Sequence, residues 1–137
     1  FIQLILGAFV SGMDAGKIYN SWPLMGNSYF PDDNNIVDLF KISVFDDPSL
    51  TQFIHRNLAY FIMAFYIYTF YFYFKRKLNN YFRILVIIGI ILLFQIFLGI
   101  LTVLSGAQIF YSSLHQINTI LLVSSSICFL FISKKRN

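Results

Sequence analysis

Three apolar stretches, each long enough to cross a lipid bilayer, dominate this sequence of 137 residues. They run from about Thr51 to Phe74, from Phe82 to Leu104 and from Phe110 to Ile132. A helix needs about 20 apolar residues to cross the hydrocarbon core. A fourth apolar stretch, from Phe1 to Met13, is too short by about a third. These stretches predict an all-α membrane protein, a four-helix transmembrane bundle whose first helix is truncated.

The composition agrees with a membrane location and excludes other classes of protein. Hydrophobic residues make up 58% of the chain and charged residues only 12%, whereas soluble domains contain about 25% charged residues. The net charge of +4 is small and segregated along the chain, so no nucleic-acid partner is expected. Cys128 is the single cysteine, which excludes an intramolecular disulfide and a thiolate metal site.

The first apolar stretch lacks the features of a signal peptide. It has no initiator methionine, no basic segment and no A-x-A cleavage site. We therefore expect it to be the C-terminal part of a longer helix. Residues 1–137 are expected to form a single transmembrane domain within a larger protein.

The distribution of charge predicts the orientation of the helices. The segment 14–50 contains all six aspartates and only two lysines. Basic residues gather instead in the hinge 75–83 and at the C-terminus, as Lys134, Lys135 and Arg136. The positive-inside rule puts both basic clusters on the cytoplasmic or matrix side of the membrane. The segment 14–50 then lies outside, together with the short turn 105–108.

Two local structures are predicted within this outer segment. Residues 35–41 are expected to form one short helix in the membrane interface, with their apolar side chains on one side. Asp47 and Pro48 have the residue types of a helix start, the first as the cap and the second in the first turn.

A short internal repeat places one histidine in each of two helix pairs. The run QLILG at residues 3–7 recurs as QIFLG at residues 95–99. The helix after each run carries a single histidine, His55 or His115, soon after it re-enters from outside. With a helical rise of about 1.5 Å per residue, both histidines lie roughly 8–10 Å below the outer surface. The final glycines of the two runs lie at nearly the same depth.

Two imidazoles at one depth on alternate helices of a bundle are suited to ligate a haem iron from both faces. His55 and His115 are the only histidines in the chain, and a histidine buried in lipid is costly unless it has a function. Gly7 and Gly99 are predicted to let the flat macrocycle approach the other two helices, and Arg56 to pair with a haem propionate. No acidic residue lies in the three long spans, which argues against a carboxylate di-metal site.

Each of these features also has a simpler interpretation. A histidine in a membrane helix often bonds a neighbouring helix, and Arg56 is equally suited to reach the lipid headgroups. Gln3 and Gln95 are predicted to form hydrogen bonds between helices rather than to bind iron. Asn57 and Asn118 are interpreted in the same way.

Several motifs together resemble the haem A synthase family. They are the outer run GMDAGKIYNSWPLM at 12–25, followed by FPDD at 30–33, and the runs QFIHR at 52–56, QIFLGILT at 95–102 and SLHQ at 113–116. They match the C-terminal half of that family in order and spacing over essentially the whole chain. The outer run is similar to the mitochondrial and alphaproteobacterial branch.

The resemblance implies a fold and a function. The family has eight membrane helices in two similar halves, and it oxidises a methyl group of haem O to the formyl group of haem A, which serves terminal oxidases. His55 and His115 are then implied as axial ligands of a b-type haem, with the substrate haem in the N-terminal half. That half carries a glutamate three residues before its first histidine. The corresponding residue here is Gln52, which cannot act as an acid or a base.

Three functions follow from these observations. The first is the cofactor-bearing half of haem A synthase, an oxidoreductase in the bacterial plasma membrane or the mitochondrial inner membrane, inactive without its N-terminal half. The second is a stand-alone b-type cytochrome or membrane anchor that relays electrons. The third is a membrane assembly subunit without a cofactor, in which the histidines only bond across helices.

Overall fold

The structure, a computed structural model, describes residues 1–135, and its regular elements are all helical. The α-helices are α1 Ile2–Gly12, α2 Pro48–Lys75, α3 Phe82–Leu104 and α4 Ile109–Lys135, and the short 3-10 turns are η1 Ala15–Lys17, η2 Ile36–Phe40, η3 Ile42–Phe45 and η4 Asn79–Tyr81. Helices α2, α3 and α4 are long and apolar enough to cross a membrane, whereas α1 is shorter. The predicted all-α class with four helices is confirmed.

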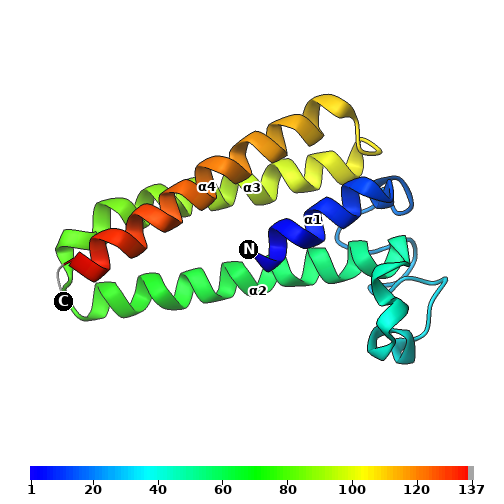
Figure 1. Cartoon of the computed structure of the whole chain (residues 1–137), viewed down its shortest axis with the longest axis horizontal. Coiled ribbons are helices and arrows are strands. Elements are labelled where there is room, and N and C mark those ends of the chain that lie inside the picture. Colours follow the sequence, from blue (N-terminus) through cyan, green and yellow to red (C-terminus); the bar gives the residue numbers. More distant parts are fainter. Residues whose placement is uncertain (136–137) are drawn as a thin grey trace.

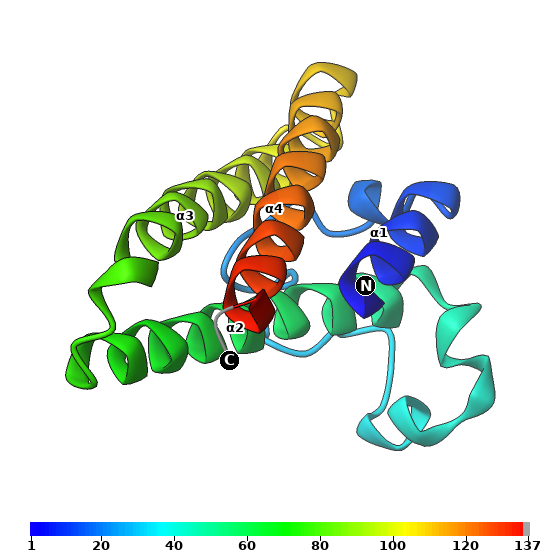
Figure 2. The same cartoon turned by 60° about the vertical axis from the view of Figure 1, so that its left-hand side comes forward.

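The helices form two pairs. Helix α1 packs along part of α2, and α3 packs along α4 (Figure 1); a second view shows the same pairing (Figure 2). The connection 13–47 and the α3–α4 turn lie at one end of the molecule, which we call the outer end (Figure 1). The α2–α3 hinge and the end of α4 lie at the opposite, inner end (Figure 1).

Aromatic side chains hold the inner end together. The ring of Tyr73 in α2 meets Phe129 in α4 at 5.5 Å and Tyr81 before α3 at 5.3 Å, both edge-on. Edge-to-face contacts of this kind add to the energy of burial. They bring the basic hinge and the exposed Lys134 to one end, while Arg136 lies outside the described residues. The side of the membrane that this end faces stays a prediction.

Burial follows the helical period in α3. Leu85, Ile88 and Leu92 are buried at spacings of three and four residues, which is the repeat of one helix face. The opposite face of the helix leaves large apolar side chains such as Ile90 and Leu93 exposed. Apolar side chains on an outward face are expected where a helix meets lipid instead of water.

Helix α2 begins earlier than the apolar pattern suggests. Asp47 Oδ1 accepts a hydrogen bond of 2.9 Å from the backbone N–H of Leu50, and Pro48 occupies the first helical position. This confirms the predicted cap. The helix starts at Pro48, whereas the apolar stretch starts near Thr51. The two differ because the cap and the first turn contain polar residues, which a search for apolar stretches leaves out. The outer connection is therefore 13–47.

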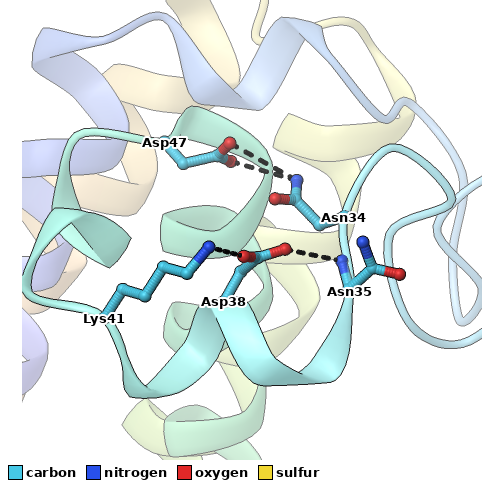
Figure 3. A network of polar contacts seen from close by, with 5 residues as sticks. All are labelled: Asn34, Asn35, Asp38, Lys41 and Asp47. Carbon is cyan, nitrogen blue, oxygen red and sulfur yellow. Dashed lines mark hydrogen bonds and ion pairs between the residues drawn. The ribbon is translucent and has the colours of Figure 1, made fainter.

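The short helix expected at 35–41 is present as a 3-10 helix, Ile36–Phe40, and a second 3-10 helix, Ile42–Phe45, follows it. The carboxylate of Asp38 accepts a hydrogen bond of 2.9 Å from the backbone N–H of Asn35 and one of 2.6 Å from Lys41 Nζ (Figure 3). Asn34 Nδ2 in turn donates to Asp47 (Figure 3). The backbone of Lys41 is extended, with φ −86° and ψ 147°, and this interrupts the helix after one turn. The side-chain cap thus stabilises a turn that is too short to become an α-helix.

A close contact between α2 and α3 rests on a glycine. Tyr66 Oη donates a hydrogen bond of 2.9 Å to the carbonyl of Leu85, and its hydroxyl lies over Gly89, where a Cβ atom would be only 2.2 Å from Oη. We expect Gly89→Ala to lower the free energy of unfolding by about 1–3 kcal/mol, because the tyrosine must move out of the site. Thermal unfolding in detergent measures the loss.

The matched background for this substitution is Tyr66→Leu. In Tyr66→Leu the phenol ring that would obstruct an alanine at position 89 is absent. Adding Gly89→Ala to this variant should therefore lower the free energy of unfolding very little. An equal loss in both backgrounds would contradict the proposed contact.

A carboxylate in the outer loop makes the loop sensitive to acid. Partial burial opposes the ionisation of Asp33, but hydrogen bonds from Ser49, Tyr19 and Asn34 outweigh it and hold the pKa of Asp33 below its usual value. A lowered pKa stabilises the folded loop at neutral pH, and this contribution disappears as the pH falls through the usual aspartate value of about 3.9 and below. Hydrogen exchange of the amides in residues 32–34, measured relative to their intrinsic rates, should therefore accelerate on acidification.

Asp33→Asn should remove this dependence on pH. Asp46→Asn is the matched control, since Asp46 is exposed, and it should retain the acceleration. A flat profile in the unsubstituted protein would contradict the prediction.

Candidate functional site

His115 of α4 is hydrogen-bonded to the backbone of α3. Its Nδ1 atom lies 3.1 Å from the carbonyl oxygen of Gln95. A carbonyl oxygen only accepts, so Nδ1 carries the ring proton and donates it. In a neutral imidazole the lone pair is then on the other nitrogen, Nε2. The contact with the α3 backbone thus sets both the orientation and the tautomer of the ring.

The side-chain amide of Gln95 lies over the face of the same ring. Its nitrogen is 3.2 Å from Nδ1 and 3.1 Å from Nε2 of His115. One carbon atom separates the two ring nitrogens, so a point in the ring plane that is this close to both would overlap that carbon. The amide must therefore lie above the ring, and it does not occupy the in-plane lone pair of Nε2.

Two further side chains of α4 hold the Gln95 amide. Its Oε1 accepts a hydrogen bond of 2.8 Å from Asn118 Nδ2, and its Nε2 donates one of 2.6 Å to Thr119 Oγ1. Asn118 is buried and also donates to the carbonyl of Ile91 at 3.0 Å. The predictions that Gln95 and Asn118 bond across helices are both confirmed.

His55 of α2 is paired with α1 in a different way. The amide nitrogen of Gln3 lies 3.3 Å from His55 Nε2 and 3.1 Å from the His55 carbonyl oxygen. The amide N–H groups only donate, so Nε2 accepts. The other ring nitrogen, Nδ1, is buried without a hydrogen-bond partner among residues 1–135. The predicted bond of Gln3 to the neighbouring helix is also confirmed.

The two glycines of the repeat lie against the two imidazoles. A Cβ atom at Gly7 would be 3.4 Å from Cε1 of His55, and one at Gly99 would be 3.1 Å from Cε1 of His115. The repeat therefore places a glutamine and a glycine, four residues apart, against the histidine of the next helix in each pair. That the glycines also let a macrocycle approach stays a prediction.

The residues present fit a bis-histidine haem. Each imidazole keeps one ring nitrogen without an in-plane partner in residues 1–135, Nδ1 of His55 and Nε2 of His115. Nε2 of His115 carries a lone pair, whereas Nδ1 of His55 carries the ring proton as long as Nε2 accepts from Gln3. The two rings belong to different helix pairs. No group of three or more His, Cys, Asp or Glu side chains in the part of the chain that the structure describes forms a metal cluster. Two imidazoles alone suit a haem iron, whose other ligands come from the macrocycle.

Arg56 binds backbone carbonyls of the outer loop, a role that differs from the two expected from the sequence, pairing with a haem propionate and reaching the lipid headgroups. Its Nη1 donates to the carbonyls of Ser21 and Leu24 at 3.0 and 3.4 Å, and its Nη2 donates to the carbonyl of Tyr19 at 3.0 Å. The residue is only 9% exposed, so its head lies within the protein and not among lipid headgroups. Its Nε has no partner among the described residues. Pairing of Arg56 with a haem propionate stays a prediction.

Arg56 belongs to a row of polar side chains that bind the outer loop. Gln52, Arg56 and Tyr60 are four residues apart on one face of α2. Gln52 Nε2 donates to the carbonyl of Tyr19 at 3.1 Å, and Tyr60 accepts from the indole N–H of Trp22 at 2.9 Å. Sequence reasoning missed this row as a unit, although the four-residue spacing of its polar members was visible.

One of the predicted helix-to-helix bonds is wrong. Asn57 accepts a hydrogen bond of 2.6 Å from the hydroxyl of Tyr29 in the outer loop, and it donates to Phe53 in its own helix. The reason is that the outer loop folds back over this face of α2 and supplies the partner.

Comparison with known proteins identifies the family. A family model described as cytochrome oxidase assembly protein, COX15-CtaA, matches residues 1–127. The chain is also 46% identical over 136 residues to the haem A synthase of Pelagibacter ubique, which covers 99% of this chain and 39% of that relative. The chain belongs to the haem A synthase family.

Other haem A synthases show the same pattern of coverage. The relative from Rickettsia prowazekii is 36% identical over 137 residues, covering 98% of this chain and 40% of its own length. The relative from Roseobacter denitrificans is 33% identical over 120 residues, covering 85% and 30% respectively. The chain thus spans about two fifths of the length of these relatives. No solved structure matches. The resemblance to haem A synthases of the alphaproteobacterial branch is confirmed.

Gln52 has a structural task in this member of the haem A synthase family. It is buried, and its amide nitrogen is bound to the outer loop, while its Oε1 has no partner in residues 1–135. A neutral amide tolerates this burial more easily than a carboxylate. Gln52 therefore helps to dock the loop.

Proposed function

We propose that this chain is the C-terminal, cofactor-haem-binding half of haem A synthase. The proposal assigns His55 and His115 as the axial ligands of a b-type haem. The observation that carries it is that each histidine, on its own helix pair, keeps one ring nitrogen without an in-plane protein partner. Iron binding through Nδ1 of His55 requires that the ring proton move from Nδ1 to Nε2. Family membership supports it, because the relatives are haem A synthases.

In this proposal a bound haem supplies an iron that accepts and gives single electrons. The residues of the chain orient the ligands and keep water away. Gln95, with Asn118 and Thr119, holds His115, and Gln3 contacts His55. The absence of acidic residues from the spans and the amide at Gln52 leave no carboxylate here to transfer a proton. This half therefore handles electrons, and the oxidation of haem O to haem A takes place in the N-terminal half.

The proposal also defines a location and partners. The chain spans the bacterial plasma membrane or the mitochondrial inner membrane several times, with the hinge 75–83 and the C-terminus on the cytoplasmic or matrix side. Its partners are the lipid bilayer, the four-helix N-terminal half, and haem O and haem A as substrate and product of the complete enzyme.

A stand-alone b-type cytochrome is the second candidate. It is favoured by the fact that both ligands, and the side chains that hold them, come from this one chain. Complementation separates the two functions. A strain without haem A synthase should regain haem A when the chain is expressed with the N-terminal half of a relative, and not when that half is expressed alone.

The first test is an optical spectrum. The protein is expressed from its own gene without a His tag, supplied with haem, purified in detergent, and recorded in its reduced and oxidised states. A sharp low-spin b-type difference spectrum is expected. A well-folded sample without bound haem would refute the bis-histidine assignment for this protein and would favour the assembly subunit without a cofactor.

A further inference from the structure

Helix α3 exposes a backbone carbonyl to a neighbouring helix at two places. At the first, the Tyr66 hydroxyl donates to the carbonyl of Leu85, and the residue four positions later is Gly89. At the second, His115 Nδ1 donates to the carbonyl of Gln95, and the residue four positions later is Gly99. A helical side chain covers the turn that precedes it, so a glycine at this position leaves the carbonyl open to a second hydrogen bond.

The hydrogen bond to the Gln95 carbonyl determines which nitrogen of His115 can bind a metal. Because Nδ1 of His115 donates to a carbonyl, the proton is fixed on Nδ1 and the lone pair on Nε2. Histidines that bind metals usually donate their other N–H to a carbonyl or a carboxylate, which fixes the tautomer and the ring orientation. His115 already has this arrangement.

His55 has no equivalent contact. Its Nδ1 has no partner among residues 1–135, and its Nε2 only receives an N–H from Gln3 at 3.3 Å. The glycine at the equivalent position, Gly7, is also less crowded, since a Cβ there would meet the ring at the ordinary contact distance of 3.4 Å. The internal repeat thus produces two histidines with similar neighbours but different hydrogen bonds.

We propose that the two axial ligands are unequal. Because Gly99 has no side chain, His115 can reach the Gln95 carbonyl, and this hydrogen bond fixes the ring for iron binding through Nε2. His55 has no such hydrogen bond, so the orientation and tautomer of its ring are free to adapt to the haem. Gln95 and Gly99 are positioning residues, since they act through His115. This inference rests on the proposed haem ligation by His55 and His115.

The test compares Gly99→Ala with Gly7→Ala in the haem-loaded protein. Both substitutions add one methyl group to a helix, beside the ring of a predicted ligand. At position 99 the methyl would be 3.1 Å from the His115 ring, closer than normal packing permits, so the ring must shift away from the Gln95 carbonyl. At position 7 the methyl fits at 3.4 Å. We expect the transfer of haem to apomyoglobin to be about tenfold faster or more in Gly99→Ala, since loss of an outer-shell partner costs 10–100-fold in metal affinity.

Two further measurements complement the transfer rate, and the second of them needs no haem. The low-spin electron paramagnetic resonance signal should shift in Gly99→Ala and remain unchanged in Gly7→Ala. In ¹⁵N-histidine-labelled protein before haem loading, His115 should show a protonated Nδ1 and an unprotonated Nε2. The second measurement needs no substitution, so it remains decisive if Gly99→Ala fails to fold.

Each outcome has one meaning. Low-spin haem in the unsubstituted protein, with a selective effect of Gly99→Ala, supports the inference. The same haem with equal effects of the two substitutions, or with a proton on Nε2 of His115, overturns it and leaves the proposed function intact. Absence of low-spin haem from the unsubstituted protein overturns the proposed function itself.

Discussion

Replacement of either His55 or His115 by alanine is expected to abolish the low-spin haem spectrum. A six-coordinate low-spin iron needs both axial imidazoles, and these are the only two histidines in the chain. No group of three or more His, Cys, Asp or Glu side chains in residues 1–135 is placed to hold a metal. The reduced-minus-oxidised spectrum of the purified variants measures the effect.

The controls are polar residues on the same helices that bond only to their own backbone. Thr69 of α2 donates to the carbonyl of Phe65, and Ser126 of α4 donates to that of Leu122. Thr69→Ala and Ser126→Ala should retain the full haem signal. Retention of low-spin haem in either histidine variant would remove that residue from the ligand pair.

The two histidine variants should also differ in stability before haem is added. His115→Ala removes the ring that donates to the Gln95 carbonyl at 3.1 Å, whereas His55→Ala removes a longer bond from Gln3, at 3.3 Å, together with one unsatisfied buried nitrogen. A lost hydrogen bond costs about 1 kcal/mol, and loss of an unsatisfied group costs less. We therefore expect His115→Ala to unfold at the lower temperature.

Substitution of Arg56 by methionine is expected to release the outer loop from α2. The guanidinium group donates to the carbonyls of Tyr19, Ser21 and Leu24. Hydrogen bonds to a charged group contribute about 1.5–3 kcal/mol each, but removal of the buried charge recovers part of this. We expect the docked loop to lose about 2–4 kcal/mol of stability.

The single tryptophan of the chain reports this release. Trp22 lies in the loop, and its indole N–H donates to Tyr60 of α2 at 2.9 Å. In Arg56→Met the fluorescence of Trp22 should shift and be quenched more strongly by a soluble quencher, because the indole, 43% exposed when docked, becomes freer. Hydrogen exchange should accelerate in residues 19–24. Arg56→Lys should release the loop nearly as much as Arg56→Met, because a single ammonium group cannot donate to all three carbonyls that the planar guanidinium group reaches.

The same variants distinguish loop docking from a contact with haem. If Arg56 pairs mainly with a propionate, Arg56→Met will weaken haem binding while Trp22 stays in place. If Arg56 mainly docks the loop, Trp22 is released whether or not haem is bound. Unchanged fluorescence together with unchanged haem binding would contradict both roles.

The sequence was sufficient for features that depend on local pattern. Apolar length predicted the helices, and the residue types at Asp47 and Pro48 predicted the start of α2. The amide residue types of Gln3 and Gln95 within apolar helices predicted that they bond between helices. Such features are visible in sequence because the period of a helix, and the rules for its caps, relate residues only a few positions apart.

The tertiary structure decided what depends on segments far apart in the chain. Arg56 is bound to loop carbonyls 32–37 residues away, and Asn57 to a tyrosine 28 residues away. Nothing in the pattern of α2 indicates that the loop returns to this face. The difference between the histidines is of the same kind. The repeated motifs predict equal neighbours, but the packing of each helix pair determines whether a ring nitrogen reaches a carbonyl. A sequence pattern specifies which residues share a helix face, whereas hydrogen bonds depend on distances and angles that only the packed helices define.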